Sequence, residues 1–418
     1  MNKSPSVYGG ACIIACVCVC VGAGMLGLPT AASGAWTWWA LLILFGAMII
    51  MTFSGWLLLE AYSSFPYKAS FSTVTETVLG KPISIINNLA VYFVGGILLY
   101  AYITSAGLVL ADMFSVNAKV TSLLYVMVFS FFVWHSTRWV DRISVLLILF
   151  MVISFVFGIS GLASQIDLSV LLNSGDEGAN YVLYVAPMLP IALASFGYHH
   201  SVSSLRDYYQ SERKAGKALI GGTVIAFVVY SAWLLSIYGN LPRGEFSHVI
   251  EAGGNADALL NQLSKVIEVT FISQVISVFS VAAILSSFIG VGLGVFDFLA
   301  DLFKFDDTKE GRTKTWCVTF IPPLVLSLLF PFGFLIAIGY AAFAAAIWAC
   351  IIPAALVAKL RAQRKADDNS EDSNDKSAEP TFTVKGGSAV LWASLFFGIA
   401  VMVIHLLTLL DVIPMFTG

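Results

Sequence analysis

Long stretches of the chain contain no aspartate, glutamate, lysine or arginine. One lies between Lys3 and Glu60, and another lies between Lys314 and Lys359. A membrane-spanning helix needs about 20 consecutive apolar residues, so each of these stretches is long enough for two helices. Turn-forming residues at 33–34 and 331–333 divide them. Seven shorter charge-free stretches hold one helix each, so the sequence predicts an all-α polytopic membrane protein with eleven transmembrane helices.

The composition supports a lipid environment. Of the 418 residues, 58% are apolar or aromatic and 11% are charged, whereas soluble domains carry about 25% charged residues. This excludes a soluble enzyme, a disordered protein and a nucleic-acid-binding protein. A membrane β-barrel is excluded because its strands would alternate apolar and polar residues over about 10 positions. The expected helices cover residues 9–31, 36–63, 83–111, 120–132, 142–163, 181–205, 215–239, 266–303, 315–329, 332–360 and 387–410.

The distribution of basic residues predicts the orientation. If the N-terminus is cytoplasmic, all but three of the 22 lysines and arginines fall in cytoplasmic segments. The exceptions are Lys119, Arg243 and Lys265. Cytoplasmic loops of membrane proteins are enriched in basic residues. We therefore expect a cytoplasmic N-terminus and, after eleven crossings, a C-terminus on the opposite side.

Two of the expected spans contain helix-weakening residues at corresponding positions. The first contains GAGMLGLP at residues 22–29, and the sixth contains Pro187, Pro190 and the segment 195–200. Inside a membrane, unwound backbone is tolerated only where it faces protein or a water-filled cavity. Because spans one and six begin consecutive sets of five, the pairing predicts an inverted-repeat transporter with discontinuous helices. Kinks that only help helices to pack are the alternative interpretation.

These patterns divide the chain into three parts. Residues 1–360 form the expected transporter core, with spans one to five and six to ten as inverted repeats. Residues 361–386 are polar and rich in charge, which is typical of a flexible cytoplasmic loop. Residues 387–418 hold the eleventh helix and the C-terminus.

The interruption in the first span is a candidate site for a carboxylate. Its GAGMLG matches the dinucleotide-binding pattern, but it follows a membrane segment rather than a strand, so we reject that interpretation. An opened helix instead offers backbone amides and the positive end of a half-helix dipole. The candidate residues are Ala23, Gly24, Met25 and Gly27.

The interruption in the sixth span forms the expected facing half of the site. A serine and freed backbone groups hydrogen-bond the charged groups of a ligand, and aromatic rings stack on its side chain. Tyrosines of the third span line a third side. Ordinary core aromatics are the alternative interpretation. The candidates are Ser195, Phe196, Gly197, Tyr198, Tyr100 and Tyr102.

Ionisable residues inside the spans are candidates for proton coupling or gating. His199 and His200 titrate near neutral pH when unperturbed, although a neutral histidine that fixes the unwound backbone is an equal alternative for His199. Glu60 braces the two interruptions or carries a proton, and a solvated carboxylate is its alternative. Asp297, near the inner end of the eighth span, is a gate or interface charge.

The eighth span contains a possible cation site. Ser286 and Ser287 offer hydroxyl oxygens that would ligate Na⁺ together with backbone carbonyls, or they bond back to their own helix. Gly290 and Gly294 form a GxxxG face for close helix packing. No metal-ligand cluster, nucleophile set or acid pair is recognisable, so we expect no metal, no cofactor and no enzymatic activity.

The chain resembles the bacterial hydroxy/aromatic amino acid permease family over nearly its whole length. The motifs PRGEF and GGNAD in the external loop resemble the tryptophan permeases more than the tyrosine permeases. The motifs are GAGMLGLP (22–29), ASFGYH (194–199), PRGEF (242–246), GGNAD (253–257), SSFIGVGLGVFDFLADLF (286–303) and AIGY (337–340).

This resemblance implies a leucine-transporter-like (LeuT-type) core of five plus five helices with helices 1 and 6 broken, plus an eleventh helix. It also implies proton-coupled uptake across the bacterial inner membrane, with a periplasmic C-terminus. We therefore expect a secondary active transporter that imports tryptophan by proton symport. Alternatives are tyrosine or broad aromatic amino acid transport, Na⁺ coupling, and, from a different class, a channel or a membrane-embedded enzyme.

Two features depart from the family pattern. The family usually has glycine after the histidine of the sixth span, where this chain has His200. That difference weakens a model in which one histidine carries the proton. The polar loop at 361–380 is also longer and more acidic than is usual for the family, which affects only the surface.

Overall fold

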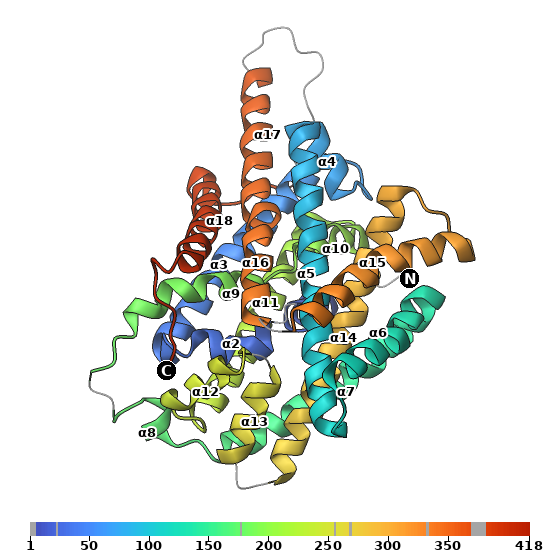
Figure 1. The fold of residues 1–418 in the computed structure, drawn as a ribbon. Helices are drawn as coiled ribbons and strands as arrows, with labels where there is room; N and C mark the ends of the chain where they lie inside the picture. The colour runs from blue at the N-terminus through green and yellow to red at the C-terminus, as the bar shows by residue number, and fades with distance from the viewer. Residues whose placement is uncertain are drawn as a thin grey trace.

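The computed structural model describes residues 6–21, 24–175, 178–254, 256–266, 270–331, 334–368 and 382–418. Within these ranges every regular element is a helix (Figure 1), which confirms the predicted all-α class. The first half contains α1 (Val7–Val21), α2 (Gly24–Ala32), α3 (Trp36–Tyr62), α4 (Phe71–Leu79), α5 (Lys81–Phe114), α6 (Ala118–His135), α7 (Thr137–Ala163), α8 (Leu168–Leu171), η1 (Val182–Tyr184), α9 (Val185–Ser195), η2 (His199–Ser201) and α10 (Val202–Tyr209).

The second half begins with a long helix of 27 residues. It contains α11 (Glu212–Tyr238), η3 (Arg243–Glu245), α12 (Phe246–Glu251), α13 (Ala256–Val266), α14 (Thr270–Phe303), α15 (Lys309–Leu329), α16 (Phe334–Ala346), the π-helix η4 (Ile347–Ile351), α17 (Ile352–Asp368) and α18 (Gly387–Leu409).

Nine helical stretches of the described chain are long and apolar enough to cross a membrane. Each corresponds to one expected span. The two other expected spans are α1 with α2, which lie on either side of residues 22–23 outside the described chain, and α15, whose first turns carry Lys309, Glu310, Arg312 and Lys314. The total of eleven therefore stays a prediction, with nine stretches that meet the criterion for spanning.

The helices extend past the apolar segments because polar residues cap their ends. α11 begins at Glu212, where the Ser211 hydroxyl accepts a hydrogen bond from the Lys214 amide at 3.5 Å. α15 begins in the same way at Lys309, after Thr308, whose hydroxyl accepts from the Gly311 amide at 3.2 Å. Such caps satisfy amides that have no partner within the helix. Charge-free stretches therefore locate the spans but miss the capped turns outside the hydrocarbon.

α17 continues into the segment expected to be a loop. The helix runs to Asp368, and the structure is next described from residue 382. The sequence KLRAQRKA at 359–366 consists mostly of strong helix formers, which explains why helix persists beyond the apolar residues. In Figure 1, α17 projects from the body of the molecule near α4 and α5.

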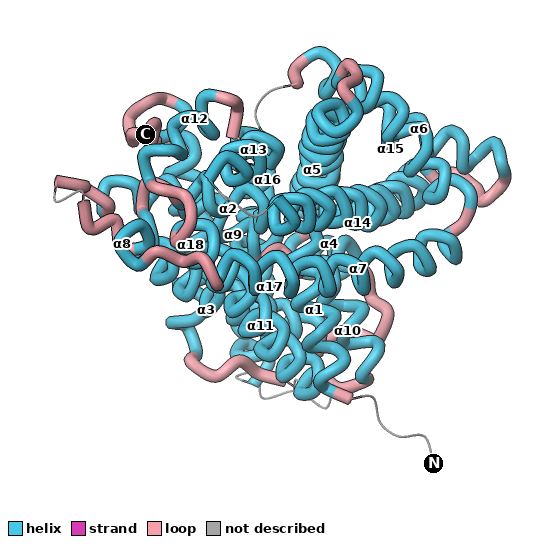
Figure 2. The backbone as a smooth tube through the Cα atoms, turned by 90° about the horizontal axis from the view of Figure 1, so that it is seen from below, coloured by secondary structure: helices cyan, strands magenta, loops and turns pink. Residues whose placement is uncertain are grey.

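The centre of the molecule is formed by α11, α1, α2 and α9. α1 packs along α11, α2 packs on α9, and α9 also contacts α3 and α16. Figure 2 shows these helices grouped beside a second group that contains α5, α14 and α7. Two buried tyrosines of α11 reach the first span: Tyr238 donates to the Pro29 carbonyl at 2.9 Å, and Tyr230 reaches the last described turn of α1.

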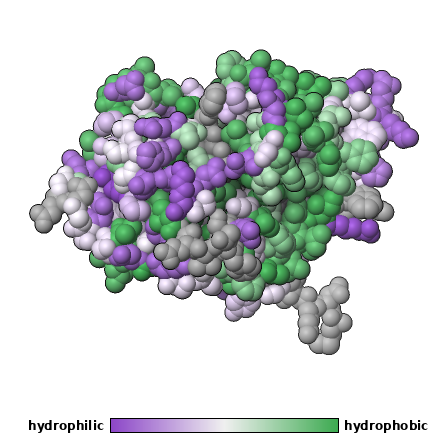
Figure 3. Space-filling model, turned by 60° about the horizontal axis from the view of Figure 1, so that its bottom comes forward, coloured by the Kyte–Doolittle hydropathy of each residue, from purple (hydrophilic) through white to green (hydrophobic). Residues whose placement is uncertain are grey.

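The outer surface carries large apolar side chains. Figure 3 shows apolar residues covering the side where α6 and α7 lie in Figure 1, while polar residues gather near α8 and α12. Such a surface is stable only against another apolar phase, which agrees with a protein embedded in lipid. The most exposed apolar residues of α7 include Val145, Leu146, Leu149 and Phe157.

The glycines of α14 do not form the expected GxxxG packing face. A side chain at Gly290 or Gly294 would meet nothing within 4 Å, whereas one at Gly292 would lie 3.0 Å from the Phe320 ring. α14 is therefore rotated so that Gly292 faces α15. The four-residue spacing was correct for a helix but identified the wrong face.

The π-helix η4 forms where Pro353 interrupts the backbone ladder. Proline has no amide hydrogen, so it cannot donate to the carbonyl of Ala349 four residues earlier. The Ser54 hydroxyl of α3 donates to that carbonyl, and the Ser394 hydroxyl of α18 donates to the Cys350 carbonyl at 3.1 Å. Neighbouring helices thus satisfy freed carbonyls, as membrane interiors require.

Candidate functional site

The sixth expected span is interrupted where the sequence predicts. α9 ends at Ser195, and helical structure resumes at His199 in η2. Pro190 lies inside α9, and Gly197 lies in the interruption. The Ser195 hydroxyl donates to the Ile191 carbonyl of its own helix at 2.8 Å, so this side chain stabilises the last turn of α9.

The last described turn of α1 and the last residue of α9 contact one side chain. The Tyr230 hydroxyl of α11 lies 2.8 Å from the Cys18 carbonyl oxygen of α1 and 2.6 Å from the Ser195 carbonyl oxygen of α9. The last described turn of α1 therefore lies beside the end of α9, whereas residues 22–23, at which the first span is predicted to be interrupted, lie outside the described residues. Nothing in the sequence distinguishes Tyr230 from other aromatics of an apolar span, so sequence analysis missed this residue.

Some of the predicted substrate-binding residues lie around this junction. Gly24 begins α2, and Met25 and Gly27 are buried within it, while Ala23 lies outside the described residues. Because α2 packs on α9, the structure brings these glycines and Met25 to the helix that carries Ser195. Phe196 is fully buried, and its ring meets that of Tyr230 edge to face at 5.6 Å.

Tyr198 points away from this junction toward α3. Its hydroxyl donates to the Met51 carbonyl at 2.8 Å, and a side chain at Gly55 would overlap that hydroxyl. Its ring stacks on His199 with centroids 4.7 Å apart. Tyr198 therefore anchors the chain after the interruption to α3.

The two tyrosines of α5 are buried. The Tyr100 hydroxyl donates to the Phe330 carbonyl at the end of α15, at 2.6 Å. Tyr102 is 1% exposed. The contact of Tyr100 ties α5 to the end of α15, so this residue lies at the interface between these two helices.

His199 is buried against the aromatic rings of Tyr198 and Trp348. Among the described residues, neither of its ring nitrogens has a hydrogen-bond partner, and the same holds for the indole nitrogen of Trp348. The two rings meet edge to face at 6.0 Å. His200 is exposed and lies 6.5 Å from the Trp348 ring. The π-helix thus presents an aromatic side chain to both candidate histidines.

Glu60 lies near the C-terminal end of α3 and pairs with residues other than those of the interruptions. Its carboxylate oxygens accept from the Arg361 guanidinium at 2.8 and 2.7 Å, and one also accepts from the Val384 amide at 2.8 Å. The bracing expected at the broken helices is found instead between α3, α17 and the segment before α18. Glu60 is 1% exposed, so it is not a solvated carboxylate.

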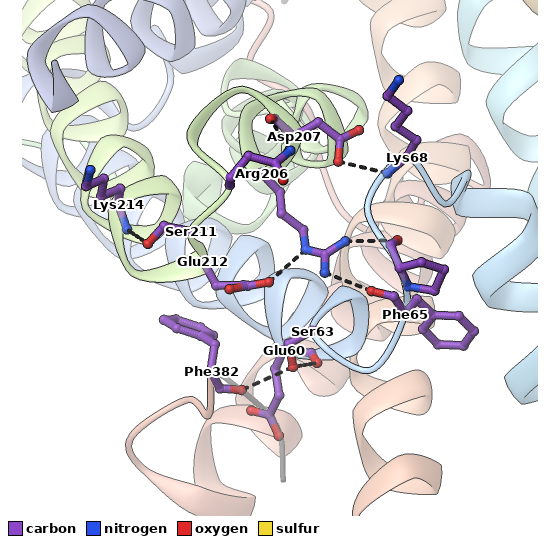
Figure 4. Close-up of polar contacts among 12 residues, drawn as sticks. Glu60, Ser63, Phe65, Lys68, Arg206, Asp207, Ser211, Glu212, Lys214 and Phe382 are labelled. Atoms are coloured by element: carbon purple, nitrogen blue, oxygen red, sulfur yellow. Dashed lines mark hydrogen bonds and ion pairs between the residues drawn. The ribbon is translucent and has the colours of Figure 1, made fainter. Parts of the chain in front are cut away.

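A second buried ion pair lies nearby and was not predicted. Figure 4 shows the Arg206 guanidinium reaching Glu212 on one side and the α3–α4 loop on the other. Its Nε lies 2.9 Å from the Glu212 carboxylate, and it donates to the carbonyls of Phe65 and Pro66 at 2.8 and 3.2 Å. Both charged side chains are at most 6% exposed.

The remaining candidates lie on α14. Ser286 and Ser287 are buried, and the Ser287 hydroxyl donates to the Ala283 carbonyl at 2.8 Å, as its alternative interpretation expected. Asp297 is exposed two turns or more further along the helix. Among the described residues, no group of three or more histidines, cysteines or acidic residues is arranged to hold a metal ion.

Comparison with known sequences identifies relatives of the whole chain. Residues 3–405 match the tryptophan/tyrosine permease family. The chain is 42% identical to a tryptophan-specific transport protein of Haemophilus influenzae, covering 100% of this chain and 99% of the relative. It is 36% identical to a low affinity tryptophan permease of Escherichia coli K12, covering 99% of each.

Comparison with solved structures addresses the fold. Crystal structures of mutants of a manganese transporter from Eremococcus coleocola superpose with TM-scores of 0.59 and 0.60. The second covers 97% of this chain and 86% of the other at 12% sequence identity. This similarity concerns the fold alone, and it confirms the predicted leucine-transporter-like class.

Proposed function

The chain belongs to the tryptophan/tyrosine permease family, and we propose that it is a secondary active transporter that imports tryptophan together with a proton. The observation that carries this proposal is the described interruption of the sixth span after Ser195, whose carbonyl shares the Tyr230 hydroxyl with the Cys18 carbonyl of α1. Inverted-repeat transporters bind their substrates between two such discontinuous helices. The names of the relatives, which are tryptophan-specific or tryptophan permeases, support the choice of substrate.

The charged groups of an amino acid match the half-helix ends. The amino end of α2, which begins at Gly24, carries partial positive charge and suits the carboxylate. The carboxyl end of α9, with the carbonyl of Ser195, carries partial negative charge and suits the ammonium group. Phe196, fully buried beside this junction, supplies an aromatic face for the indole.

His199 is the proposed proton carrier. It lies four residues after the end of α9, and neither ring nitrogen has a hydrogen-bond partner among the described residues. Protonation of a buried imidazole that has no hydrogen-bond partners is energetically favourable only when a counter-charge, such as a substrate carboxylate, approaches. This makes its protonation dependent on substrate, which symport requires. Na⁺ coupling through Ser286 and Ser287 is the alternative.

The proposal includes an arrangement in the bacterial inner membrane. Residues 1–360 form the inverted-repeat core, residues 361–386 connect it to α18 on the cytoplasmic side, and residues 387–418 end in the periplasm. The distribution of the 22 basic residues supports a cytoplasmic N-terminus. Membership in a permease family indicates a transporter rather than an enzyme.

Uptake by proteoliposomes tests the function. One positive charge moving through about 100 mV releases about 2.3 kcal/mol, which supports about 40-fold accumulation of tryptophan. We expect concentrative uptake of labelled tryptophan under a proton gradient without Na⁺, and its loss when a protonophore is added. Tyrosine and phenylalanine serve as competitors.

The alternatives give different results in the same assay. A strict requirement for Na⁺ would replace the proton with Na⁺ as the coupling ion. Equal competition by tyrosine and phenylalanine would make the protein a broad aromatic amino acid permease. Flux that is not accelerated by unlabelled tryptophan on the far side would indicate a channel.

A further inference from the structure

The short helix η3, within the PRGEF motif at residues 242–246, contacts the turn between α2 and α3. The Arg243 guanidinium donates to the Ser33 carbonyl at 3.2 Å and to the Gly34 carbonyl at 3.0 Å. Both residues are buried and directly follow α2. A guanidinium is planar and has several donors in a fixed arrangement, so it can hold two successive carbonyls at once.

Three aromatic rings lie close to the same guanidinium. Its central carbon lies 4.2 Å from the centroid of the Phe416 ring, 5.1 Å from that of Tyr181 and 5.8 Å from that of Tyr184. Tyr184 is the last residue of η1, and α9 begins at the next residue. Guanidinium groups are attracted to aromatic rings within about 6 Å. Arg243 therefore contacts both the chain that leaves α2 and the chain that enters α9.

Gly34 brings these two segments into direct contact. A side chain at this position would lie 2.7 Å from atoms of both Tyr184 and Phe416. The rings of Tyr184 and Phe416 also meet edge to face, with centroids 5.3 Å apart. The turn after α2 thus fits against Tyr184 because residue 34 is a glycine, which lets the backbone approach closely.

The two contacted segments adjoin the ends of two short helices that pack on each other. α2 ends at Ala32 and α9 begins at Val185. The opposite ends of the same helices, at Gly24 and Ser195, are those to which the proposed function assigns the amino acid. With nine and eleven residues, the helices are about 14 and 17 Å long. A displacement at the end that Arg243 holds is therefore carried over a short distance to the candidate site.

We propose that Arg243 is a positioning residue that holds the turn after α2 against the start of α9, and thereby sets the alignment of the two helix ends that bind the amino acid. The inference rests on the proposed function, which assigns an amino acid to those ends. It gives the PRGEF motif a role at a distance from the substrate. Arg243 acts through the backbone of α2 and α9 and needs no contact with the substrate.

Arg312 offers a comparison elsewhere in the fold. Its guanidinium likewise donates to two successive carbonyls, those of Trp134 and Val133, and lies 5.2 Å from the centroid of the Phe296 ring. These contacts join α15 to α6 and α14, which are not the interrupted spans. Both arginines therefore lose the same kinds of contact when changed to glutamine, but those of Arg243 join α2 to α9.

The test compares Arg243→Gln with Arg312→Gln in the purified full-length protein reconstituted in lipid nanodiscs. The dissociation constant for labelled tryptophan, the number of binding sites per protein molecule and the melting temperature are measured for the wild type and each variant. Arg243→Gln should raise the dissociation constant about tenfold without changing the number of sites. A defect of folding alone would instead reduce the number of sites. Arg312→Gln should stay within about twofold of the wild-type dissociation constant, although both variants should melt at lower temperature.

Gly34→Ala tests the same alignment while leaving Arg243 in place. The added methyl group would overlap Tyr184 and Phe416, so it should push the turn away from the start of α9 and raise the dissociation constant for tryptophan. Gly46→Ala is the matched control, since a side chain there meets nothing within 4 Å.

Two results would overturn the proposal. One is wild-type affinity in Arg243→Gln, and the other is an equal loss of affinity in Arg243→Gln and Arg312→Gln. If Arg243→Gln does not survive purification, wild-type affinity in Gly34→Ala overturns the proposal instead. Failure of the wild type to bind tryptophan would remove the proposed function, and the positioning role with it.

Discussion

A buried histidine without hydrogen-bond partners is costly, and His199 is such a residue. It is 2% exposed, it stacks on Tyr198, and both ring nitrogens are unpartnered among the described residues. Burial of a polar group without a compensating hydrogen bond opposes folding. A group retained at such a cost is a candidate for function inside a membrane, where ionisable residues are rare.

Replacement of this residue separates coupling from binding. His199→Gln should reduce proton-driven accumulation of tryptophan by at least tenfold while exchange of internal for external tryptophan continues, because exchange needs no net proton movement. Both rates are measured in proteoliposomes. His135→Gln, at the end of α6, is the matched control and should behave as wild type. Equal loss of accumulation and exchange would make His199 a structural or binding residue.

The buried ion pair between Arg206 and Glu212 should contribute to stability far more than an exposed pair. Glu212→Gln leaves a buried guanidinium without its counter-charge and should destabilise the protein by about 3 kcal/mol. The exposed pair between Lys314 and Glu310 is the comparison. Glu310→Gln should leave the melting temperature almost unchanged, because solvent screens that pair. Equal melting temperatures for the two variants would contradict this assignment.

Sequence analysis identified residue types better than residue partners. The interruption at residues 196–198 was predictable because glycine and proline act locally. The partners of Glu60 were not, because Arg361 and Val384 are about 300 residues away in the chain and no local pattern relates them. Tyr230 was missed for the same reason: its contacts depend on where α1 and α9 lie in space.

At the scale of elements, the contact between α1 and α11 depends on the absence of side chains. A side chain at Gly222 would lie 2.8 Å from the Ala11 carbonyl oxygen and would overlap Ile14. One at Gly221 would lie 2.8 Å from the Ala11 side chain. Small residues let membrane helices approach closely, and dispersion contacts then hold them together. α11 thus packs closely against α1 at Gly221 and Gly222, which precede Tyr230 in the helix.

Enlarging this face should separate the two helices. Gly222→Val should abolish tryptophan uptake and reduce the yield of monodisperse protein, because α1 must shift by more than a side-chain rotation allows. Gly46→Val is the matched control, since a side chain there meets nothing within 4 Å. Size-exclusion chromatography and uptake measure both effects. Normal yield and uptake in Gly222→Val would contradict the close packing of α1 on α11.

Spans were predictable as elements, whereas their ends, rotation and internal irregularities were not. The apolar stretches located nine spans because a membrane demands them. The face of α14 that packs was assigned wrongly, since spacing alone does not say which side of a helix meets a neighbour. The π-helix at 347–351 needed Ser54 and Ser394 from distant helices to satisfy its carbonyls, so it follows from packing rather than from local sequence.

At the scale of the whole molecule, whether α15 spans the membrane determines on which sides of it the two termini lie. It has 21 residues, which suffice to span, but Pro322 and Pro323 lie inside it and charged residues occupy its first turns. Arg312 donates to the carbonyls of Trp134 and Val133 at the end of α6, at 2.6 and 2.9 Å. The basic end of α15 is thereby held beside the C-terminal end of α6, on the side that the distribution of basic residues predicts to be cytoplasmic.

Reporter fusions test whether α15 crosses. Alkaline phosphatase, which is active only outside the cytoplasm, should be inactive when fused after Asp306 and active when fused after Pro331, because α15 lies between these positions. Fusions after Asp368 and after Gly418 give the same pair of readings for α18. Equal activity at the first two positions would mean that α15 does not span. The termini would then lie on the same side, and the separation of basic residues that predicts the orientation would no longer hold for the second half of the chain.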